Sequence, residues 1–587
     1  MGRKVRIKIG LLMGVAAGLS LWGLGWCLPE EARIARVLPS GINTPEFREL
    51  LQTSWKSLHQ KLGPDILLHP EVFSMGFEKI TQVPMSWKTP PPVLLNSARS
   101  FYLRSGHEDE ADILVALSRI RPHCLELNPR IYYYGGAYMY SLGAWIAALS
   151  LVTPATLRSG IGFYLEHIDK MAWLYFLGRL FSVAVYGAAL WLLYQTGRRF
   201  FSQKVGLWAA TLFAVCPGVV LQTHYMKPHL LGSVFVLATF YGCADLLKTG
   251  NLKAGHWAGV TAGLAGGTAI HLWSSFFILL FSAALRMGQG QSVRTEARWL
   301  LRAGLLAVAV YFLVNPYLLT EMQTSWKATQ AQTTFLSVQP SKIIRFFFYG
   351  LPHSITWPLY FCLLAGLFTQ KNLKDPVRLL GLLSFAGFLL TTWIYPIVDR
   401  FDSVRYFGIL SVGFLLAAIR IEEWRSSWRR IVWVPILNAA LLSLVIDYNL
   451  HLDATGRSTR HAAGRWIEQE IPEDSDLGFL RLPQPSNSPY FQWNRYHLTF
   501  VELRSLAQME FPEKLPQYLV LTSSDYDDRR ALGHVLREHY RKIKTFPPAS
   551  WGWVRPPIGQ IYGNPLVEIY QKREGDKRHE QYASAIG

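Results

Sequence analysis

Residues 104–145 read RSGHEDEADILVALSRIRPHCLELNPRIYYYGGAYMYSLGAW, and this stretch places acidic side chains just ahead of an apolar run. Glu108, Asp109 and Glu110 stand at the start of a segment whose apolar residues recur at helical spacing, and the partial positive charge of a helix N-terminus tolerates acids. The stretch therefore predicts a helix that holds carboxylates at a lipid–water boundary. The alternative is a charged helix start on a solvated loop, and the spacing alone leaves both open.

The composition of the chain is that of a membrane protein. Of its 587 residues 50% are hydrophobic, and several windows reach the roughly 17–25 apolar residues that span a bilayer. The 59 lysines and arginines exceed the 40 acids, but they lie mostly between apolar runs, as in cytoplasmic loops, which argues against nucleic-acid binding. The five cysteines show no CxxC spacing, so neither a disulfide framework nor a zinc site is indicated. The sequence predicts a polytopic α-helical membrane protein.

The N-terminal part predicts one membrane span followed by a large outer loop. Basic residues precede an apolar run that ends at residue 28 without a small-residue cleavage site, so we expect residues 1–28 to form an uncleaved first transmembrane helix with its N-terminus in the cytoplasm. Residues 29–153 then form an extracytoplasmic loop that carries the acidic motif. Apolar residues at helical spacing over residues 47–62 predict a helix that lies flat on the membrane.

The remaining chain divides into a membrane domain and a soluble domain. Basic clusters alternate sides over residues 172–446 only if residues 135–152 form a re-entrant or interfacial element, which leaves about eleven transmembrane helices in all. Over residues 447–587 charged residues return, together with short β-like runs and a helical pattern at residues 460–471. About 140 residues suffice for a small α/β domain with its own core, which we expect on the extracytoplasmic side.

Three segments, in this order, carry a resemblance to a known superfamily. HEDEAD…LNPRIYYYGGAYMY resembles an Asp-Glu motif followed by a Pro/Tyr-rich approach to the membrane. FLGRLFSVAVYGAALWLLYQTGRRFFSQKVGLWAATLFAVCPGVVLQTHYMKPH is similar to an Arg-containing span, a Gly-Arg-Arg turn, an Ala-rich span and a polar outer motif, and VRYFGILSVGFLL resembles the Arg-Tyr start of a late span. In these segments the chain resembles integral-membrane glycosyltransferases of the GT-C type, which include protein O-mannosyltransferases and the aminoarabinose transferases that modify lipid A.

The resemblance implies inverting transfer of a sugar from a polyprenyl-phosphate-linked donor to an extracytoplasmic acceptor, which is a lipid, a glycan or a protein. We expect the chain in a bacterial inner (cytoplasmic) membrane. The resemblance implies Asp109 as the base that takes the proton of the acceptor hydroxyl. Glu110 would orient the acceptor or help to bind a divalent cation, if one is used. Glu30 and Glu31 stand where the acidic motif of the family is normally found and remain an alternative acid pair.

Cations at the outer boundary are the candidates for binding the donor phosphate. We expect Lys227 and Arg405 to do so, because ammonium and guanidinium groups stabilise a departing phosphate; basic residues also lie at span ends merely to reach water. His224 and His229 flank Lys227 and line the same cleft or contribute to a metal site, or else are structural histidines. Tyr133 is a candidate for stacking against the sugar, with an interfacial aromatic belt as the plain alternative.

Two rival functions stay open at this point. Arg179 lies inside an apolar run, where an ionisable residue is a functional candidate unless it reaches back to boundary water. A transporter or lipid flippase would place more such groups at mid-span and carry internal repeats, of which the sequence has no sign. A non-catalytic scaffold of GT-C architecture is the second rival. The sequence leaves open the sugar, the acceptor, metal dependence, the oligomeric state and the role of residues 29–102.

Overall fold

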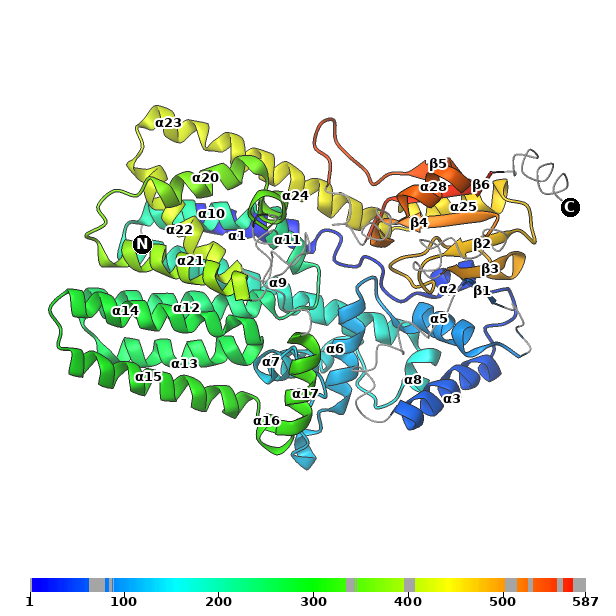
Figure 1. The fold of residues 1–587 in the computed structure, drawn as a ribbon, viewed down its shortest axis with the longest axis horizontal. Helices are drawn as coiled ribbons and strands as arrows, with labels where there is room; N and C mark the ends of the chain where they lie inside the picture. Colours follow the sequence, from blue (N-terminus) through cyan, green and yellow to red (C-terminus); the bar gives the residue numbers. More distant parts are fainter. Residues whose placement is uncertain are drawn as a thin grey trace, which may run out of the picture.

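The computed structural model consists of a helical bundle with a mixed sheet at one end (Figure 1). The residues that it describes are 3–62, 80–83, 87, 89–333, 344, 346–394, 407–501, 515–525, 532–556 and 563–573. The helices of the bundle are α1 (Arg3–Leu21), α9 (Ile168–Phe200), α10 (Gln203–Ala214), α11 (Pro217–Thr223), α12 (His229–Thr249), α13 (Leu252–Thr268), η3 (Ile270–Ser275), α14 (Phe276–Gly288), α15 (Val293–Val314), α16 (Tyr317–Thr320), α17 (Met322–Thr333), η4 (Phe346–Gly350), α19 (Leu351–Ile355), α20 (Trp357–Phe368), α21 (Pro376–Ile394), α22 (Phe407–Glu423), α23 (Ser426–Ile431) and α24 (Trp433–Ala454).

The bundle contains several helices that satisfy the requirements of a membrane span. In the described part of the chain, 5 helices are long and apolar enough to cross a membrane, or up to 7 if each bent helix pair counts as one span. The predicted count of about eleven crossings is therefore not confirmed. The helices α13 and α22 lie where crossings were predicted but have 17 residues each, fewer than the about 20 residues that a bilayer core requires of an untilted helix.

Small residues bring two of these helices into close contact. A Cβ atom added to Gly259 would lie 2.5 Å from the carbonyl oxygen of Ala303, and one added to Gly263 would lie 2.4 Å from that of Ala307. Both pairs have a spacing of four residues, so they form one stripe along α13 and one along α15. Backbones approach this closely in membranes where small side chains line the interface.

The loop after α1 folds into helices that lie at the end of the bundle nearest the sheet (Figure 1). They are α2 (Glu31–Val37), α3 (Pro45–Leu62), α5 (Pro92–Leu103), α6 (Glu108–Arg119), η2 (Pro122–Cys124), α7 (Gly136–Ser150) and α8 (Ile161–Glu166). The predicted helices at the acidic motif and over residues 47–62 are confirmed as α6 and α3. Helix α7 packs against α9 and α13, and its 15 residues are too few for an untilted crossing. Its re-entrant or interfacial placement stays a prediction.

The C-terminal region is built on a six-stranded mixed sheet of order β1-β3-β2-β4-β6-β5. Strand β2 pairs in parallel with β3 and β4, and the other pairs are antiparallel. The elements are β1 (Ile80–Val83), α25 (Thr459–Glu470), β2 (Asp476–Phe479), η6 (Trp493–Arg495), β3 (His497–Val501), β4 (Tyr518–Thr522), η8 (Ser523–Asp525), α28 (Gly533–His539), β5 (Tyr540–Phe546) and β6 (Val567–Lys572).

This sheet confirms the predicted α/β character of the C-terminal region and adds one feature. The predicted helix over residues 460–471 is α25, and the two β-like runs are β4 and β6. The edge strand β1, however, comes from the loop after α1 and pairs with β3, Ile80 facing Val501 in register. The loop of residues 29–153 and the region of residues 447–587 therefore share one sheet. The domain boundaries and the side of the membrane stay predictions.

Candidate active site

Helix α6 begins with the acidic triplet that the sequence singles out. His107 is its N-cap residue, and the Nδ1 atom of His107 accepts a hydrogen bond from the backbone N–H of Asp109 at 3.3 Å. Burial, together with the nearby charge of Lys227, lowers the pKa of His107 to about 4, so the imidazole is neutral and its Nδ1 lone pair can serve the cap. Successive helical residues point about 100° apart, so Asp109 and Glu110 face different parts of the molecule.

Asp109 faces the lysine that was predicted at the outer boundary. Lys227 Nζ lies 2.9 Å from Asp109 Oδ2, and the Tyr134 hydroxyl donates a hydrogen bond to the same oxygen at 2.9 Å. Burial raises the pKa of Asp109, but the charge of Lys227 and both hydrogen bonds outweigh this and hold the pKa well below its usual range. The side chain of Asp109 is 34% exposed and that of Lys227 14%, so the ion pair is accessible.

Glu110 faces a different part of the molecule, where it forms a fully buried ion pair. The Nε and Nη2 atoms of Arg179 donate to its two carboxylate oxygens at 3.0 and 2.8 Å, and both side chains have 0% exposure. The Ser105 hydroxyl and the Met226 backbone N–H donate to the same carboxylate at 2.5 and 2.9 Å. Burial raises the pKa of Glu110, but Arg179 outweighs it and lowers the pKa below the ordinary value. The sequence alternative that Arg179 reaches boundary water is wrong.

The same arginine ties α6 to the end of the first helix. The Nη1 atom of Arg179 donates to the carbonyl oxygens of Leu24 and Trp26 at 2.8 and 2.7 Å, and its Cζ atom lies 4.7 Å from the centroid of the Trp26 ring. Four segments that are distant in sequence therefore meet at this pair: the end of α1, α6, α9 and the turn before α12. The role of Glu110 in orienting an acceptor stays a prediction. Its contacts give Glu110 a structural role, because they hold the first turn of α6 in place.

The two histidines that flank the lysine lie in different surroundings. The Nε2 atom of the buried His224 lies 3.0 Å from the carbonyl oxygen of Trp22, so this ring faces α1. His229 begins α12, and the centroid of its ring lies 6.2 Å from that of Tyr134 and 5.9 Å from that of His271. Through Tyr134, His229 belongs to the surroundings of the exposed acid of α6, whereas His224 belongs to a helix interface.

The other predicted site residues divide between this cluster and positions elsewhere. Tyr133 is half-buried, and burial together with the charges of Asp112 and Asp109 raises its pKa well above the usual value, so it lies near both acids as a protonated phenol. Glu30 and Glu31 are exposed at the start of α2, which packs against α5. They remain the alternative acid pair. Arg405 lies outside the described residues.

Sequence reasoning missed two residues of this site. Tyr134 donates the hydrogen bond to Asp109, whereas the prediction named its neighbour Tyr133, and three adjacent tyrosines offer no sequence signal that separates them. Asp112 lies one helical turn beyond Asp109, with its Oδ1 3.9 Å from Arg104 Nη2. Burial raises the pKa of Asp112 to about 7, a shift opposite to that of Asp109. The spacing of three residues between the two acids was a readable signal for a shared side of α6.

The site does not match the needs of a resident metal ion. Within the described ranges there is no group of three or more His, Cys, Asp or Glu side chains that could hold one. Lys227 already neutralises Asp109, and four hydrogen bonds surround the carboxylate of Glu110. Both acids are therefore already paired with cations and hydrogen-bond donors of the chain itself, and they do not form a metal site.

Residues 174–317 match the family model described as dolichyl-phosphate-mannose-protein mannosyltransferase. The matched segment covers the second of the three motifs, including Lys227, and begins after Asp109. No curated protein sequence matches the chain. Over these residues the resemblance to protein O-mannosyltransferases that the motifs predict is confirmed.

Solved structures of glycosyltransferases are similar to the chain at low identity. The archaeal oligosaccharyltransferase AglB from Archaeoglobus fulgidus, in complex with an inhibitory peptide and a dolichol-phosphate, has 13% identity and a TM-score of 0.38 over 84% of this chain and 74% of that chain. ArnT from Cupriavidus metallidurans, bound to undecaprenyl phosphate, has 11% identity and a TM-score of 0.39 over 88% and 98%. The arabinofuranosyltransferase AftD from Mycobacteria has 12% identity and a TM-score of 0.37 over 98% and 40%. These values give no residue-by-residue correspondence.

Proposed function

We propose, from the family match and from the site, that the chain is a membrane glycosyltransferase. It moves a sugar from a polyprenyl-phosphate-linked donor to an acceptor on the extracytoplasmic side of a bacterial inner membrane. The observation that carries the proposal is the accessible ion pair of Asp109 and Lys227, 2.9 Å apart. The carboxylate that would act as the base lies beside the ammonium group that would bind the phosphate, and the lysine is within the segment that matches the family.

The reaction is a single displacement at the anomeric carbon of the donor sugar. The acceptor hydroxyl oxygen attacks this carbon from the face opposite the phosphate, and the bond between the carbon and the phosphate oxygen breaks. The hydroxyl proton passes to Asp109, and the lipid phosphate leaves as an anion. A positioned general base typically contributes about 10²–10⁴-fold to such a rate. Inversion follows because attack and departure occur on opposite faces.

Lys227 serves both partners of this displacement. An ammonium group has three N–H donors, so Lys227 can keep one on Asp109 and direct another to the phosphate of the bound donor. As the charge is shared with the phosphate, its hold on Asp109 weakens and the carboxylate becomes a stronger base. Arg405, as predicted from the sequence, would add a second cation at the phosphate.

The surrounding residues position this pair. Tyr134 donates a hydrogen bond to Asp109, which fixes the direction of the carboxylate. The buried pair of Glu110 and Arg179 holds the first turn of α6 against α9, so Asp109 stays opposite the lysine. Tyr133 and His229 lie beside this cluster and are candidates for contacts with the sugar. Positioning of this kind matters because a small displacement of a catalytic group costs a large part of the rate.

The experiment is incorporation of labelled sugar from polyprenyl-phosphate donors into membranes that contain the wild-type chain or a variant. We expect Asp109→Asn to lose activity by about 10²-fold or more. The matched control is Glu30→Gln/Glu31→Gln, which removes the alternative acids from α2 and should keep activity. Loss of activity in the control alone would move the base to α2. Wild-type activity that survives in Asp109→Asn and in the control would contradict a carboxylate base in the first loop.

A further inference from the structure

A large cavity lies along α6, beyond the first turn that carries Glu110. Its volume is about 1460 Å³, and α5, α6, α7, the loop before α8 and the start of α9 contribute to its walls. From α6 it is lined by Asp112, Val115 and Arg119, which share one side of the helix at spacings of three and four residues, and also by Ala111, Leu114, Leu117 and Ser118. All these residues follow Glu110 in the chain, so the cavity runs along α6 beyond the buried ion pair.

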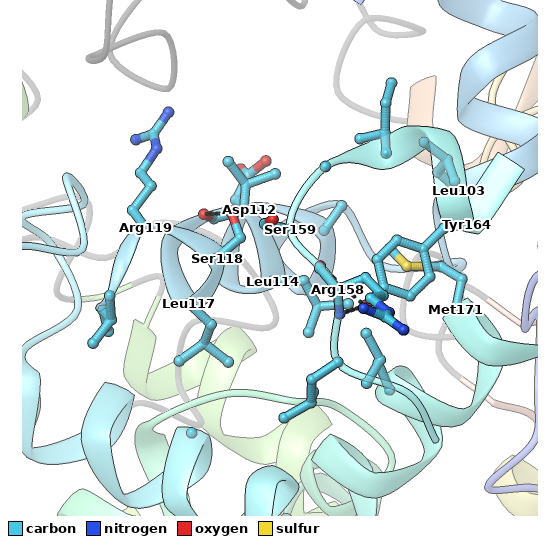
Figure 2. A pocket seen from close by; sticks show the side chains of 18 of the residues that line it. Leu103, Asp112, Leu114, Leu117, Ser118, Arg119, Arg158, Ser159, Tyr164 and Met171 are labelled. Carbon is cyan, nitrogen blue, oxygen red and sulfur yellow. Dashed lines mark hydrogen bonds between the residues drawn. The ribbon is translucent and has the colours of Figure 1, made fainter. Parts of the chain in front are cut away.

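The walls of the cavity combine an apolar part with a cationic part. Leu114 and Leu117 of α6 and Met139 and Ile146 of α7 are among the apolar lining residues. In Figure 2, Arg119 and Arg158 lie towards the two sides of the view, with Leu114 and Leu117 between them. The arginines that line the cavity are Arg99, Arg104, Arg119, Arg121, Arg130 and Arg158, and the acids are Asp112 and Glu126. The lining therefore has an excess of positive charge.

Several of these arginines already face acids. Arg104 Nη2 lies 3.9 Å from Asp112 Oδ1, and Arg121 Nε lies 3.9 Å from Glu126 Oε2. Arg130 Nη1 lies 3.0 Å from an oxygen of Glu321, which is outside the lining. Both acids of the lining, Asp112 and Glu126, are used in these pairs, so neither is left to balance the charge of Arg99 or Arg158.

Arg99 is the exception that points to a ligand. It is 7% exposed, yet its partners are neutral: its Nη2 donates to the side-chain oxygen of Asn96, its Nη1 to the carbonyl oxygen of Leu51 at 3.5 Å, and its Cζ lies 4.9 Å from the centroid of the Trp55 ring. A guanidinium has five N–H donors, so these two hydrogen bonds leave most of them for other partners. Burial and the charge of Arg104 lower the pKa of Arg99 to about 9, so it stays charged at neutral pH.

A second buried arginine shows what full satisfaction by neutral groups requires. Arg33 is 2% exposed and donates to the carbonyl oxygens of Cys27, Leu28, Phe101 and Arg104, using all three of its nitrogens. Arg33 does not line the cavity, whereas Arg99 does. A buried charge without a matching charge or a full set of hydrogen bonds is costly, and an anion in the cavity would supply both for Arg99.

We propose that this cavity is the acceptor site of the transferase and that the acceptor is an anionic amphiphile. Its phosphate or carboxylate group pairs with Arg99, and its apolar chain lies along α6 and α7. The assignment as acceptor rests on the proposed function; the binding of an anionic amphiphile does not. Asp112 lines the cavity one helical turn from Asp109, which is not itself a lining residue, so the acceptor hydroxyl would reach the base from the part of the cavity wall near Asp112. The donor phosphate then binds a separate cation, Lys227.

The test is binding of lysophosphatidic acid to the purified full chain in detergent, measured by calorimetry. Lysophosphatidylcholine, with a zwitterionic headgroup, and inorganic phosphate, without a chain, are the comparison probes. We expect lysophosphatidic acid to bind the wild type, and Arg99→Gln to weaken binding by about tenfold or more. Arg298→Gln, an exposed arginine of α15, is the matched control and should bind as the wild type does.

A second variant covers the case in which Arg99→Gln does not fold. A Cβ atom on Gly143 of α7 would lie 3.3 Å from Leu117, so Gly143→Leu fills the apolar part of the cavity and should also weaken binding. Equal binding of lysophosphatidic acid by the wild type and by folded Arg99→Gln or Gly143→Leu would overturn the proposal. If inorganic phosphate bound as tightly as the lipid, the apolar chain would contribute nothing, and the proposal that the ligand is an amphiphile would be wrong. Asp109→Asn should keep probe binding while losing transfer, so the two proposals fail separately.

Discussion

Two buried arginines near α6 have opposite kinds of partner. Arg179 of α9 faces Glu110, with both charges fully buried and matched by hydrogen bonds. Arg99 of α5 has only neutral partners among the described residues and lines a cavity of about 1460 Å³, to which α6 also contributes. The surroundings of α6 thus hold one matched charge pair and one buried charge without a matching charge.

The difference teaches what each buried charge is for. A matched pair in the interior is costly to break, so Arg179 fixes the position of α6 and with it that of Asp109. A charge without a matching partner is costly to keep, so Arg99 gains most from an anion that arrives from outside. Burial alone therefore does not distinguish a structural arginine from a ligand-binding one, and the partners of the guanidinium do.

Breaking the matched pair should have the largest effect. In Arg179→Met the carboxylate of Glu110 stays buried without its cation, and we expect the free energy of unfolding to fall by about 3–5 kcal/mol. Equilibrium unfolding in mixed SDS–detergent micelles measures this. The double variant Glu110→Leu/Arg179→Met removes both charges and should recover at least half of the loss. A single variant as stable as the wild type would contradict the structural role of the pair.

Removing the exposed cation should affect catalysis more than stability. Lys227→Gln loses the charge that faces the donor phosphate, and we expect the rate of sugar transfer to fall by about 10²–10³-fold. Lys227 also holds the pKa of Asp109 well below its usual range, so the acid limb of the rate profile should move up in this variant, to about pH 4 or above.

The measurement is kcat/KM for transfer from the lipid-linked donor as a function of pH. The matched control is Lys253→Gln, an exposed lysine at the start of α13, which should leave both rate and profile unchanged. An acid limb at the same pH in Lys227→Gln and in the wild type would mean that this lysine does not set the protonation of the base.

The stability of the chain should depend on pH through Asp112, because its pKa is shifted in the opposite direction to that of Asp109. Burial raises the pKa of Asp112 to about 7 in the folded chain. Between about pH 4 and 7 the folded state holds this proton and the unfolded state has lost it. The contribution of the bound proton to the free energy of unfolding is therefore full below that window and is lost as pH rises through it. We expect Asp112→Asn to gain stability relative to the wild type across the window, seen as thermal unfolding temperatures at pH 5, 6, 7 and 8. A constant difference would contradict the raised pKa.

Local patterns predicted the elements of this fold better than their partners. Helical spacing predicted α3, α6 and α25, because an amphipathic helix is set by residues three and four apart. The pairing of β1 with β3 was not predicted, since it joins residues about 420 positions apart and a four-residue strand carries no register signal of its own. The number of crossings also failed to be confirmed, because hydropathy does not decide whether a helix of 17 residues spans the bilayer.

The candidate site was predictable in its residue types and not in its pairs. The family resemblance singled out Asp109, and a cation at an outer boundary singled out Lys227; the structure brings the two together. The partner of Glu110 was out of reach, because Arg179 lies 69 positions away and only the packing of α6 on α9 joins them. The cavity beside Arg99 was equally hidden, since its walls come from segments whose separate patterns describe ordinary amphipathic helices.

The smallest expected effect is the one that distinguishes Arg99 from Arg179 most clearly. Replacing a buried charge that has no matching charge by an apolar side chain of similar length is often neutral or stabilising. We therefore expect Arg99→Met, in the absence of any added lipid, to change the free energy of unfolding by less than about 1 kcal/mol, or to raise it. The loss should appear only when lysophosphatidic acid is added, since the ligand then stabilises the wild type and not the variant.

The matched control for this prediction is Arg33→Met. Arg33 is buried without a carboxylate as well, but its hydrogen bonds go to four backbone carbonyl groups, which would be left unsatisfied. We expect this variant to lose stability by about 1–3 kcal/mol for each carbonyl group that stays buried and unpaired, with or without lipid. If Arg99→Met destabilised the lipid-free chain as strongly as Arg33→Met, Arg99 would be a structural residue and would not differ in kind from Arg179.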